Sequence, residues 1–316
     1  MNLPVLVIAY SRPEGLSNIL KVLQMNEIER IYIAIDGAKN RRDEVNQRSI
    51  DLIIAEFIHD TGKQIRVLKQ KQNLGIAVAI IGAIDWFFEQ EEMGVVLEDD
   101  LLIGKDFFEF ASNSLQTYEQ NDSVWMISGT QLFPNIQKAA ENVWTNYPMI
   151  WGWGSWSKKW FKMRESILAK KKIPTSSRVS PRHLFWLTGA NRVLTGKVDT
   201  WDLPLAFEFL NQNKFCILPP VNLITNVGND AVSTNTNHES RGVGMKISSL
   251  DLSYSHLTKP NLAELAEYNY LLESQVFKIR RRHVLLPFYS ALFDWVRFPK
   301  SRRKEKLLKR IVFFEF

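Results

Sequence analysis

Apolar and polar positions alternate in regular blocks over the first 120 residues. Apolar runs of strand length occupy residues 3–10, 31–35, 65–68 and 95–97. A continuous apolar run of this length is typical of a strand buried on both faces. Apolar residues at helical spacing predict helices over residues 16–23, 45–57, 76–89 and 107–118. This alternation predicts an α/β fold with a mostly parallel sheet and helices on its faces.

The pattern is less regular after residue 120. A strand is predicted over residues 124–128, and helices over residues 184–194 and 203–210. Residues 151–156 form a segment rich in Gly and Trp, and residues 228–246 are rich in Gly, Asn, Ser and Thr, which predicts a loop. We expect one large domain over residues 1–250, with halves at 1–120 and 121–250, followed by a helical extension over 251–316.

Composition adds limits on the compartment and the size of the core. The chain has 316 residues, 45% of them hydrophobic, which is enough for a large core. With one cysteine, Cys216, it forms no internal disulfide, and a reducing compartment is the simplest expectation. The first residues do not resemble a signal peptide, and no apolar stretch reaches the ~20 residues that a membrane-spanning helix needs. We therefore expect a cytoplasmic protein.

Positive charge is concentrated in the C-terminal tail. Residues 278–316 carry twelve Lys and Arg against three acidic residues, so the rest of the chain is net negative although the whole chain is +6. This argues against a nucleic-acid-binding body. Aromatic residues interleave with the basic ones, a composition typical of an interfacial contact with the inner face of the plasma membrane. A helix packed on the body and a homodimer contact are the alternatives.

Polar residues follow three of the predicted strands. Tyr10 follows the first strand, Asp36 the second, and Glu98, Asp99 and Asp100 the fourth. In parallel α/β sheets, ligands bind at the carboxyl ends of the strands. The sequence therefore predicts a ligand site at this edge.

Three adjacent carboxylates at the end of a buried strand are unfavourable, because burial and like charge both raise their pKa. A divalent cation relieves both effects, and Mg²⁺ or Mn²⁺ prefers carboxylate oxygens together with water and substrate phosphates. The alternative is a solvated acidic turn that caps the next helix. Composition alone leaves both open.

Residues 95–101 (Val-Val-Leu-Glu-Asp-Asp-Leu) and 106–108 (Asp-Phe-Phe) resemble the metal-binding strand of GT-A glycosyltransferases. The similarity is greatest to inverting enzymes like N-acetylglucosaminyltransferase I and their bacterial relatives, and it extends over residues 3–240. It implies that Asp100 binds the metal, while Glu98 and Asp99 contact the donor sugar or ribose. Residues 151–156 and 220–228 resemble further segments of the bacterial enzymes.

Other residues take roles from the same resemblance, each with an alternative. Tyr10 and Arg12 match the nucleotide-binding loop after the first strand, where Arg12 suits a diphosphate but is otherwise a surface residue. Asp36 matches an acid that meets the base or ribose, or it belongs only to a turn. Asn73 matches a loop that closes on the nucleotide, or it caps the helix after it. Trp153 contacts the sugar or belongs to the core.

An inverting transferase needs a general base. Asp202 matches the catalytic acid of the resembling family, with Glu208 as the second candidate. The family often has a second Trp shortly after this acid, but residues 203–205 are Leu-Pro-Leu, so Asp202 is alternatively a helix N-cap. His238 follows the segment at 220–228 and either approaches the metal or lies exposed in a loop.

These observations predict a GT-A glycosyltransferase that depends on Mn²⁺ or Mg²⁺. It would transfer a sugar from a UDP-sugar, or another nucleotide sugar, to a glycan or lipid-linked glycan acceptor of a bacterial surface polysaccharide. One alternative is a sugar-nucleotide nucleotidyltransferase, although such enzymes usually have a Gly-rich loop with a basic residue after the first strand. The other is a non-catalytic carbohydrate- or membrane-binding protein on the same scaffold.

Overall fold

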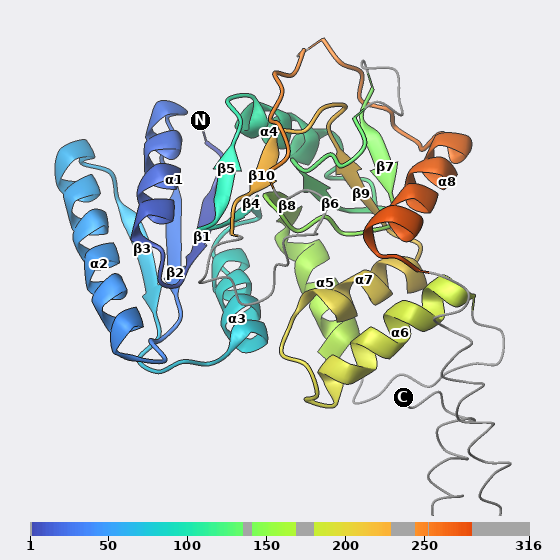
Figure 1. Ribbon diagram of the computed structural model, residues 1–316. Coiled ribbons are helices and arrows are strands. Elements are labelled where there is room, and N and C mark those ends of the chain that lie inside the picture. Colours follow the sequence, from blue (N-terminus) through green and yellow to red (C-terminus); the bar gives the residue numbers. More distant parts are fainter. Residues whose placement is uncertain (1, 135–140, 169–179, 229–243, 252, 280–316) are drawn as a thin grey trace, which may run out of the picture.

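A computed structural model describes residues 2–134, 141–168, 180–228, 244–251 and 253–279. Its centre is an eight-stranded sheet of order β3-β2-β1-β4-β8-β6-β9-β7 (Figure 1). The first four strands along the chain are parallel neighbours, and helices connect them. They are β1 (Val5–Ala9), α1 (Pro13–Met25), β2 (Ile31–Ile35), α2 (Arg41–Thr61), β3 (Ile65–Lys69), α3 (Ile76–Phe88) and β4 (Met93–Glu98).

The second half of the chain completes the sheet with mixed pairing. Strand β8 (Trp153–Trp156) lies antiparallel between β4 and β6 (Val124–Ser128), and β9 (Phe215–Leu218) runs parallel to β6. Strand β7 (Val143–Thr145) forms the edge. A separate antiparallel pair joins β5 (Leu101–Ile103) to β10 (Ile224–Asn226). This pair brings the residues after β10 beside the segment that follows β4.

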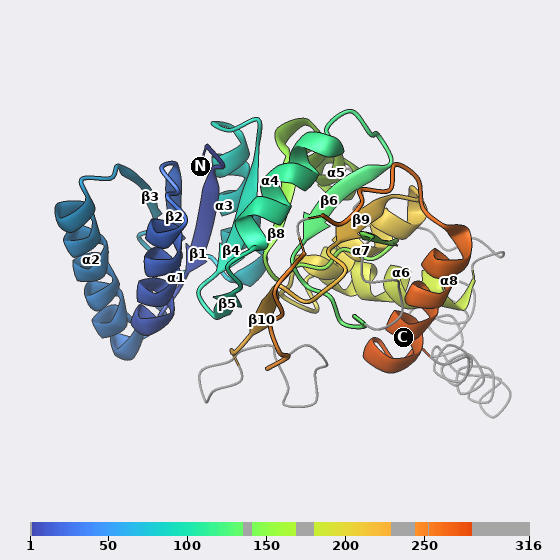
Figure 2. The ribbon, with the colours of Figure 1, turned by 90° about the horizontal axis from the view of Figure 1, so that it is seen from above.

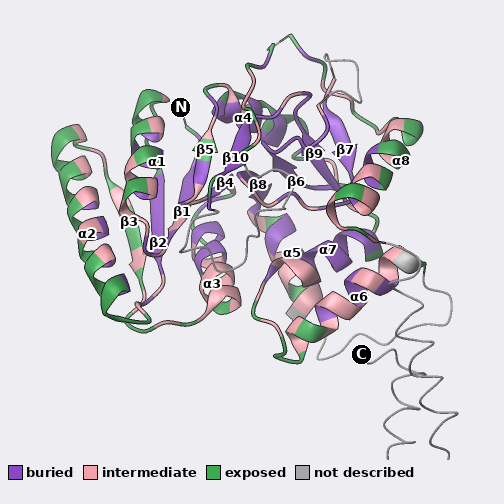
Figure 3. Ribbon diagram, viewed as in Figure 1, coloured by how far each residue is buried: buried purple, intermediate pink, exposed green. Residues whose placement is uncertain are grey.

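The remaining helices cover the two faces of the sheet. They are α4 (Phe107–Thr117), α5 (Ser157–Leu168), α6 (Pro181–Leu194), α7 (Asp202–Asn211), α8 (Leu262–Leu271) and a π-helical turn η1 (Leu272–Val276). One core lies between the sheet and α1, α2 and α4; the other contains residues of α3, α5, α6, α7 and α8. Successive side chains of a strand point to opposite faces, and accordingly Val5 and Val7 belong to the first core and Leu6 to the second. Figures 2 and 3 show these layers and their buried strands.

The predicted fold class is confirmed: the protein is a Rossmann-like α/β fold with a mixed, mostly parallel sheet flanked by helices. The Gly- and Trp-rich segment contains strand β8, which the sequence pattern did not predict as a strand. Its residues are buried on both faces, so they lack the alternation by which a half-exposed strand is recognised. Ser11 does not cap α1; Arg12 is at the N-cap position without a side-chain cap bond, and Pro13 opens the helix.

The described part of the C-terminal extension packs on the body. Tyr268 of α8 is buried and donates its hydroxyl proton to Gln131, and Asn269 accepts a hydrogen bond from Thr145 on β7. Most of the basic residues of the tail lie outside the described residues, so membrane contact stays a prediction. Among the helices described here, none is both long and apolar enough to cross a bilayer.

Helix α1 lies unusually close to the end of β4, at Gly15. A Cβ atom at this position would lie 1.9 Å from the backbone oxygen of Asp99, whereas one at Gly82 in α3 would meet nothing within 4 Å. Replacing an exposed helical glycine with alanine normally stabilises a protein by about 1 kcal/mol. We predict that Gly82→Ala raises the melting temperature by a few degrees, while Gly15→Ala lowers it. Equal effects of the two substitutions in thermal unfolding would contradict the close packing of α1 on Asp99.

Candidate functional site

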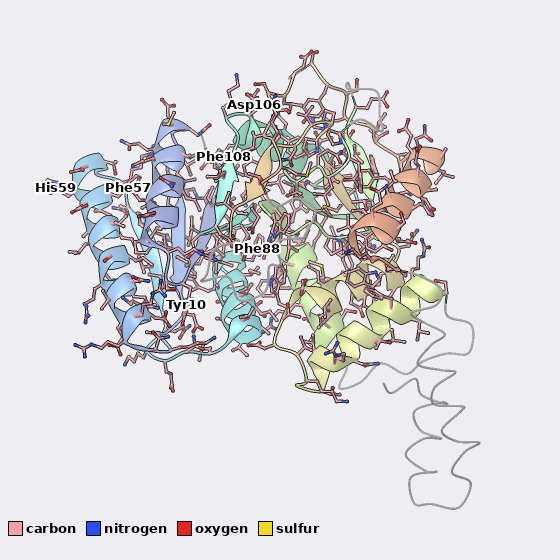
Figure 4. The ribbon with its side chains drawn as sticks, viewed as in Figure 1. Tyr10, Phe57, His59, Phe88, Asp106 and Phe108 are labelled. Carbon is pink, nitrogen blue, oxygen red and sulfur yellow. The ribbon has the colours of Figure 1, made fainter. Side chains whose placement is uncertain are left out.

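A cavity of about 680 Å³ opens at the carboxyl ends of the parallel strands. Small-molecule sites commonly have volumes of 300–1,000 Å³. Its polar side chains come from the ends of β1, β2 and β4, from α2, and from the start of α7: Tyr10, Arg12, Asp36, Lys39, Asn40, Asp43, Asn73, Glu98, Asp99, Asp100 and Asp202. Figure 4 shows Tyr10 at the lower end of the sheet, whereas Asp106, which belongs to the motif after β4, appears at the upper end. The predicted edge of the sheet is therefore a real concave site.

The acidic triplet is organised by a single arginine. Glu98 is the last residue of β4, and Asp99 and Asp100 form the turn that follows. Nη1 of Arg12 donates to Oδ1 of Asp99 at 3.1 Å and to Oδ2 of Asp100 at 3.0 Å. The backbone N–H of Tyr10 donates to the other oxygen of Asp99 at 2.9 Å. The loop after β1 thus holds the turn after β4 through charge-assisted hydrogen bonds.

The carboxyls of the triplet are destabilised as anions. Burial, together with the charges of Asp100, Asp99 and Asp202, raises the pKa of Glu98 to about 8. Burial raises the pKa of Asp99 to about 6, although the hydrogen bond from Tyr10 and the charge of Arg12 oppose it. Burial also raises the pKa of Asp100, against the effects of Arg12 and of a hydrogen bond from Asn226. One arginine does not neutralise this group of acids.

Asp36 holds the loop after β3 rather than projecting freely into the cavity. Its Oδ1 accepts hydrogen bonds from the backbone N–H groups of Gly37 and Leu74, and its Oδ2 accepts one from Nδ2 of Asn73 at 2.7 Å. Asn73 therefore does not cap α3, so that alternative is wrong. Both residues line the cavity and fix its rim.

Helix α3 is capped from a distant part of the chain. The two carboxylate oxygens of Asp199 each accept a hydrogen bond at 2.9 Å, from the N–H groups of Ile76 and Ala77. A carboxylate at a helix N-terminus is favoured by the exposed N–H groups and by the helix dipole. This contact joins the two halves of the chain across the cavity. Sequence reasoning missed Asp199, since no local pattern links it to a helix more than 120 residues away.

A polar cluster around Tyr10 was also missed. The Tyr10 hydroxyl donates to Asp43 at 2.7 Å, and Asp43 also accepts from the amide of Asn40 and the N–H of Lys39. Burial and the bond to Asp43 raise the pKa of Tyr10 to about 12. Asn40 caps α2 through the N–H groups of Arg42 and Asp43. The signal was an Asn three residues before an Asp, a pattern that marks helix starts.

The two candidate general bases, Asp202 and Glu208, lie in different environments. Asp202, the first residue of α7, lines the cavity and accepts a hydrogen bond from the Thr200 hydroxyl. Trp201 takes the N-cap position, so Asp202 is not the N-cap. Glu208 is fully buried, accepts hydrogen bonds from Ser166 and Gln212, and is not among the residues that line the cavity. The structure therefore brings only Asp202 to the acidic triplet.

Trp153 is not brought to the site. Trp153 is buried in the core, where its ring stacks on Trp201 with centroids 5.8 Å apart, and it does not line the cavity. His238 lies outside the described residues. Of the two stacked tryptophans, Trp201 is the one that lines the cavity.

The donor set suits a hard divalent cation in part. The triplet offers carboxylate oxygens, the ligands that a hard divalent cation prefers, and burial raises the pKa of all three carboxyls, which a bound cation would oppose. Within the described residues, however, no group of three or more His, Cys, Asp or Glu side chains gathers as a metal site. The chemistry of the donors therefore fits an ion that is completed by substrate phosphates and water, as Mg²⁺ commonly is.

Comparisons with known proteins show no family for this chain. No family model matches the chain. An inositol-1-phosphate CTP transferase from T. maritima matches with a TM-score of 0.39 and 12% identity, over 74% of this chain and 92% of that one. A 4-diphosphocytidyl-2C-methyl-D-erythritol synthase from Anaerococcus prevotii gives 0.35 and 12%, over 66% and 99%. A UDP-glucose pyrophosphorylase complexed with UDP-glucose gives 0.35 and 14%, over 69% and 90%.

These matches correct one expectation from the sequence. The glycosyltransferase assignment is contradicted, because the similar solved structures bear the names of nucleotidyltransferases and not of glycosyltransferases. The expectation of a nucleotide-sugar ligand stays a prediction. At this identity, the likeness extends to the fold alone.

The raised pKa of Glu98 predicts a specific dependence of stability on pH. Because its pKa in the folded protein is about 8 and its ordinary value is 4.5, the folded state binds the extra proton between these values. Stability then falls as pH rises through this window and levels off above pH 8. Thermal unfolding is measured with a chelator present. We expect Glu98→Gln to reduce the loss of stability between pH 6.5 and 8, a range in which titration of Asp99, with its pKa of about 6, contributes little. An unchanged slope in this variant would contradict the placement of Glu98.

Proposed function

We propose that this protein is a metal-dependent nucleotidyltransferase of sugar-nucleotide metabolism. It would join a nucleoside triphosphate to a sugar 1-phosphate and release diphosphate. The observation that carries the proposal is the acidic turn at Asp99 and Asp100, bridged by Arg12 inside a cavity at the carboxyl edge of a parallel sheet. The alternative weighed from the sequence thus replaces the glycosyltransferase.

The charge balance of the site supports a phosphorylated substrate that arrives with a cation. The negative charges of Asp99, Asp100 and Asp202 each raise the pKa of Glu98. The cation that forms hydrogen bonds with this group is Arg12, which bonds Asp99 and Asp100. A divalent cation, Mn²⁺ or Mg²⁺, held by Asp100 together with phosphate oxygens and water, would offset charge that builds up on the departing diphosphate. Arg12 lies where its guanidinium can turn from the carboxylates to phosphate oxygens.

The nucleoside end of the substrate fits the cluster around Tyr10. Lys39, Asn40 and Asp43 line the cavity here, and the Tyr10 ring offers a flat apolar face beside them. Asp36 and Asn73 bond to each other, so they shape this wall instead of offering a free carboxylate. We assign the base and ribose to this end, with the phosphates directed toward Arg12.

The reaction class agrees with the placement of the candidate bases. An oxygen of the sugar phosphate forms a bond to the α-phosphorus, the bond from that phosphorus to the bridging oxygen breaks, and diphosphate leaves with the electron pair. A phosphate oxygen is already ionised at neutral pH, so this step depends on positioning and charge stabilisation. No residue has to act as a general base. Asp202 and Glu98 would instead orient hydroxyl groups of the sugar.

The loop after β1 departs from the usual nucleotidyltransferase pattern. Residues 10–13 are Tyr-Ser-Arg-Pro, without a Gly-rich stretch. Arg12 supplies the basic group of this loop, and Gly15 gives the close backbone approach, since a Cβ there would collide with Asp99. The glycan or lipid-linked acceptor predicted from the sequence has no role in this reaction.

The reverse reaction provides the test. The full chain is incubated with UDP-, dTDP-, GDP- or CDP-sugars, diphosphate and Mg²⁺ or Mn²⁺, and nucleoside triphosphate is measured. We expect triphosphate and sugar 1-phosphate from at least one of these substrates. Asp100→Asn and Arg12→Met should each reduce the rate by about 10²-fold or more, because each removes charge stabilisation at the phosphates. Asp106→Asn, in the same motif but outside the cavity, should keep the activity.

Product identity decides the outcome. Formation of nucleoside diphosphate and free sugar, with no triphosphate in any combination, would contradict nucleotidyl transfer. Equal activity of Asp100→Asn and Asp106→Asn would contradict the assignment of the site.

A further inference from the structure

Helix α3 is apolar almost all round yet only partly buried. Its sequence from Ile76 to Phe88 contains Asp85 as its one charged residue. In the second half, Ala83, Ile84, Phe87 and Phe88 are buried, whereas Val78 in the first half is 60% exposed. Helices that are apolar on every side are normally covered. Other apolar side chains of the first half pack partly against the core, so Val78 is the large apolar side chain of α3 that the described residues leave exposed.

One face of this half-helix lines the cavity. The residues concerned are Ile76, Ala79, Ile80 and Ala83. Their spacing of three and four residues places them on a single stripe. Ala79 and Ile80 keep partial exposure in this position. The cavity thus has an aliphatic wall beyond its polar rim.

An aromatic wall contributes to the same cavity. Tyr147, Trp186 of α6 and Phe277 after η1 all line it, and their ring centroids lie 4.8–5.8 Å from one another. The Tyr147 hydroxyl donates a hydrogen bond to the Glu273 carboxylate at 2.7 Å. In Figure 1, α3 lies on one side of this region and α6 and α7 on the other. The cavity therefore combines a charged compartment with an apolar one, which we call the apolar slot.

We propose that the apolar slot holds the hydrocarbon chain of a substrate whose phosphate lies at Arg12. The inference rests on the proposed function, in which a phosphorylated co-substrate occupies the acidic edge of the same cavity. It adds a hydrocarbon group to the phosphorylated co-substrate of that reaction, so that the co-substrate is an amphiphilic phosphate.

The chemistry of the walls distinguishes a hydrocarbon from a sugar. A sugar ring placed against Ala79, Ile80 and Ala83 would lose hydrogen bonds to water that aliphatic side chains do not replace, and each unreplaced bond is costly. A hydrocarbon chain has no hydrogen bonds to water to lose there, and the removal of its apolar surface from water is favourable. The charged compartment instead favours a phosphate, which Arg12 can bind. The cavity as a whole therefore fits an amphiphile with a phosphate at one end and a hydrocarbon chain at the other.

A chain-length series of alkyl phosphates tests the proposal. The full chain is titrated by calorimetry with ethyl, butyl, hexyl, octyl and decyl phosphate, each below its micelle concentration. We expect affinity to rise roughly two- to fourfold for each added methylene, until the slot is filled. Inorganic phosphate and ethyl phosphate should bind weakly and about equally.

Two adjacent positions on α3 give a matched control. Ala79→Glu places a charge in the slot and should abolish the dependence on chain length, whatever its effect on the binding of ethyl phosphate. Val78→Glu adds the same charge on the exposed side of the same helix turn and should keep the full dependence. Ala79→Leu keeps the wall apolar but narrows it, and should shift the plateau to shorter chains even if the glutamate variant fails to fold.

The proposal would be overturned if the affinity of the unchanged protein did not depend on chain length, or if the two glutamate variants changed that dependence equally. The proposed function fails independently, through the absence of nucleoside triphosphate. A protein that forms triphosphate but shows no chain-length dependence keeps the function and loses the slot. The reverse result keeps the slot and loses nucleotidyl transfer.

Discussion

The site depends on the contact between Arg12 and the two aspartates that follow β4. Burial and mutual repulsion disfavour the charged forms of these carboxyls, and the Arg12 guanidinium opposes both effects by bonding to one oxygen of each. The contact requires the loop after β1 to lie against the turn after β4, and Gly15 permits that approach. A cation would offset the negative charge that the protein alone leaves at this edge. The excess of carboxylates therefore favours a cation, and favours a phosphate only when a cation accompanies it.

The cavity is formed where the two halves of the chain meet, and its walls differ in chemistry. The parallel strands supply polar residues at their ends, whereas α6, η1 and the face of α3 supply aromatic and aliphatic side chains. Asp199 binds the N-terminus of α3 and so holds the connection before α7 against the first half. Residue Ile76, which Asp199 binds, lines the cavity, so this contact between distant segments lies next to the cavity wall.

Much of the first half was predictable, because its strands and helices carry strong, uninterrupted periodicity. Strand β2 and strand β6 begin and end where the apolar pattern does, and the position of the triplet at a strand end followed from that pattern. The pattern did not reveal β8, whose buried Gly and Trp residues show no alternation, or the roles of Asp36 and Asn73, which bond to each other. Trp153 and Glu208 have the residue types of a sugar site, but only tertiary packing shows that both belong to the core. The bond between Asp43 and Tyr10 and the cap that Asp199 provides for α3 depend on contacts across the chain that no local pattern contains.

Diffraction at the manganese absorption edge, from crystals grown with Mn²⁺ and a UDP-sugar, tests the central claim most directly. The account predicts an anomalous peak in coordination contact with the Asp100 carboxylate and with the substrate diphosphate, and a nucleoside that lies against Tyr10. Arg12 should then bond to phosphate oxygen. A nucleotide bound in this cavity with no metal at Asp100, or a nucleotide bound elsewhere on the protein, would contradict it.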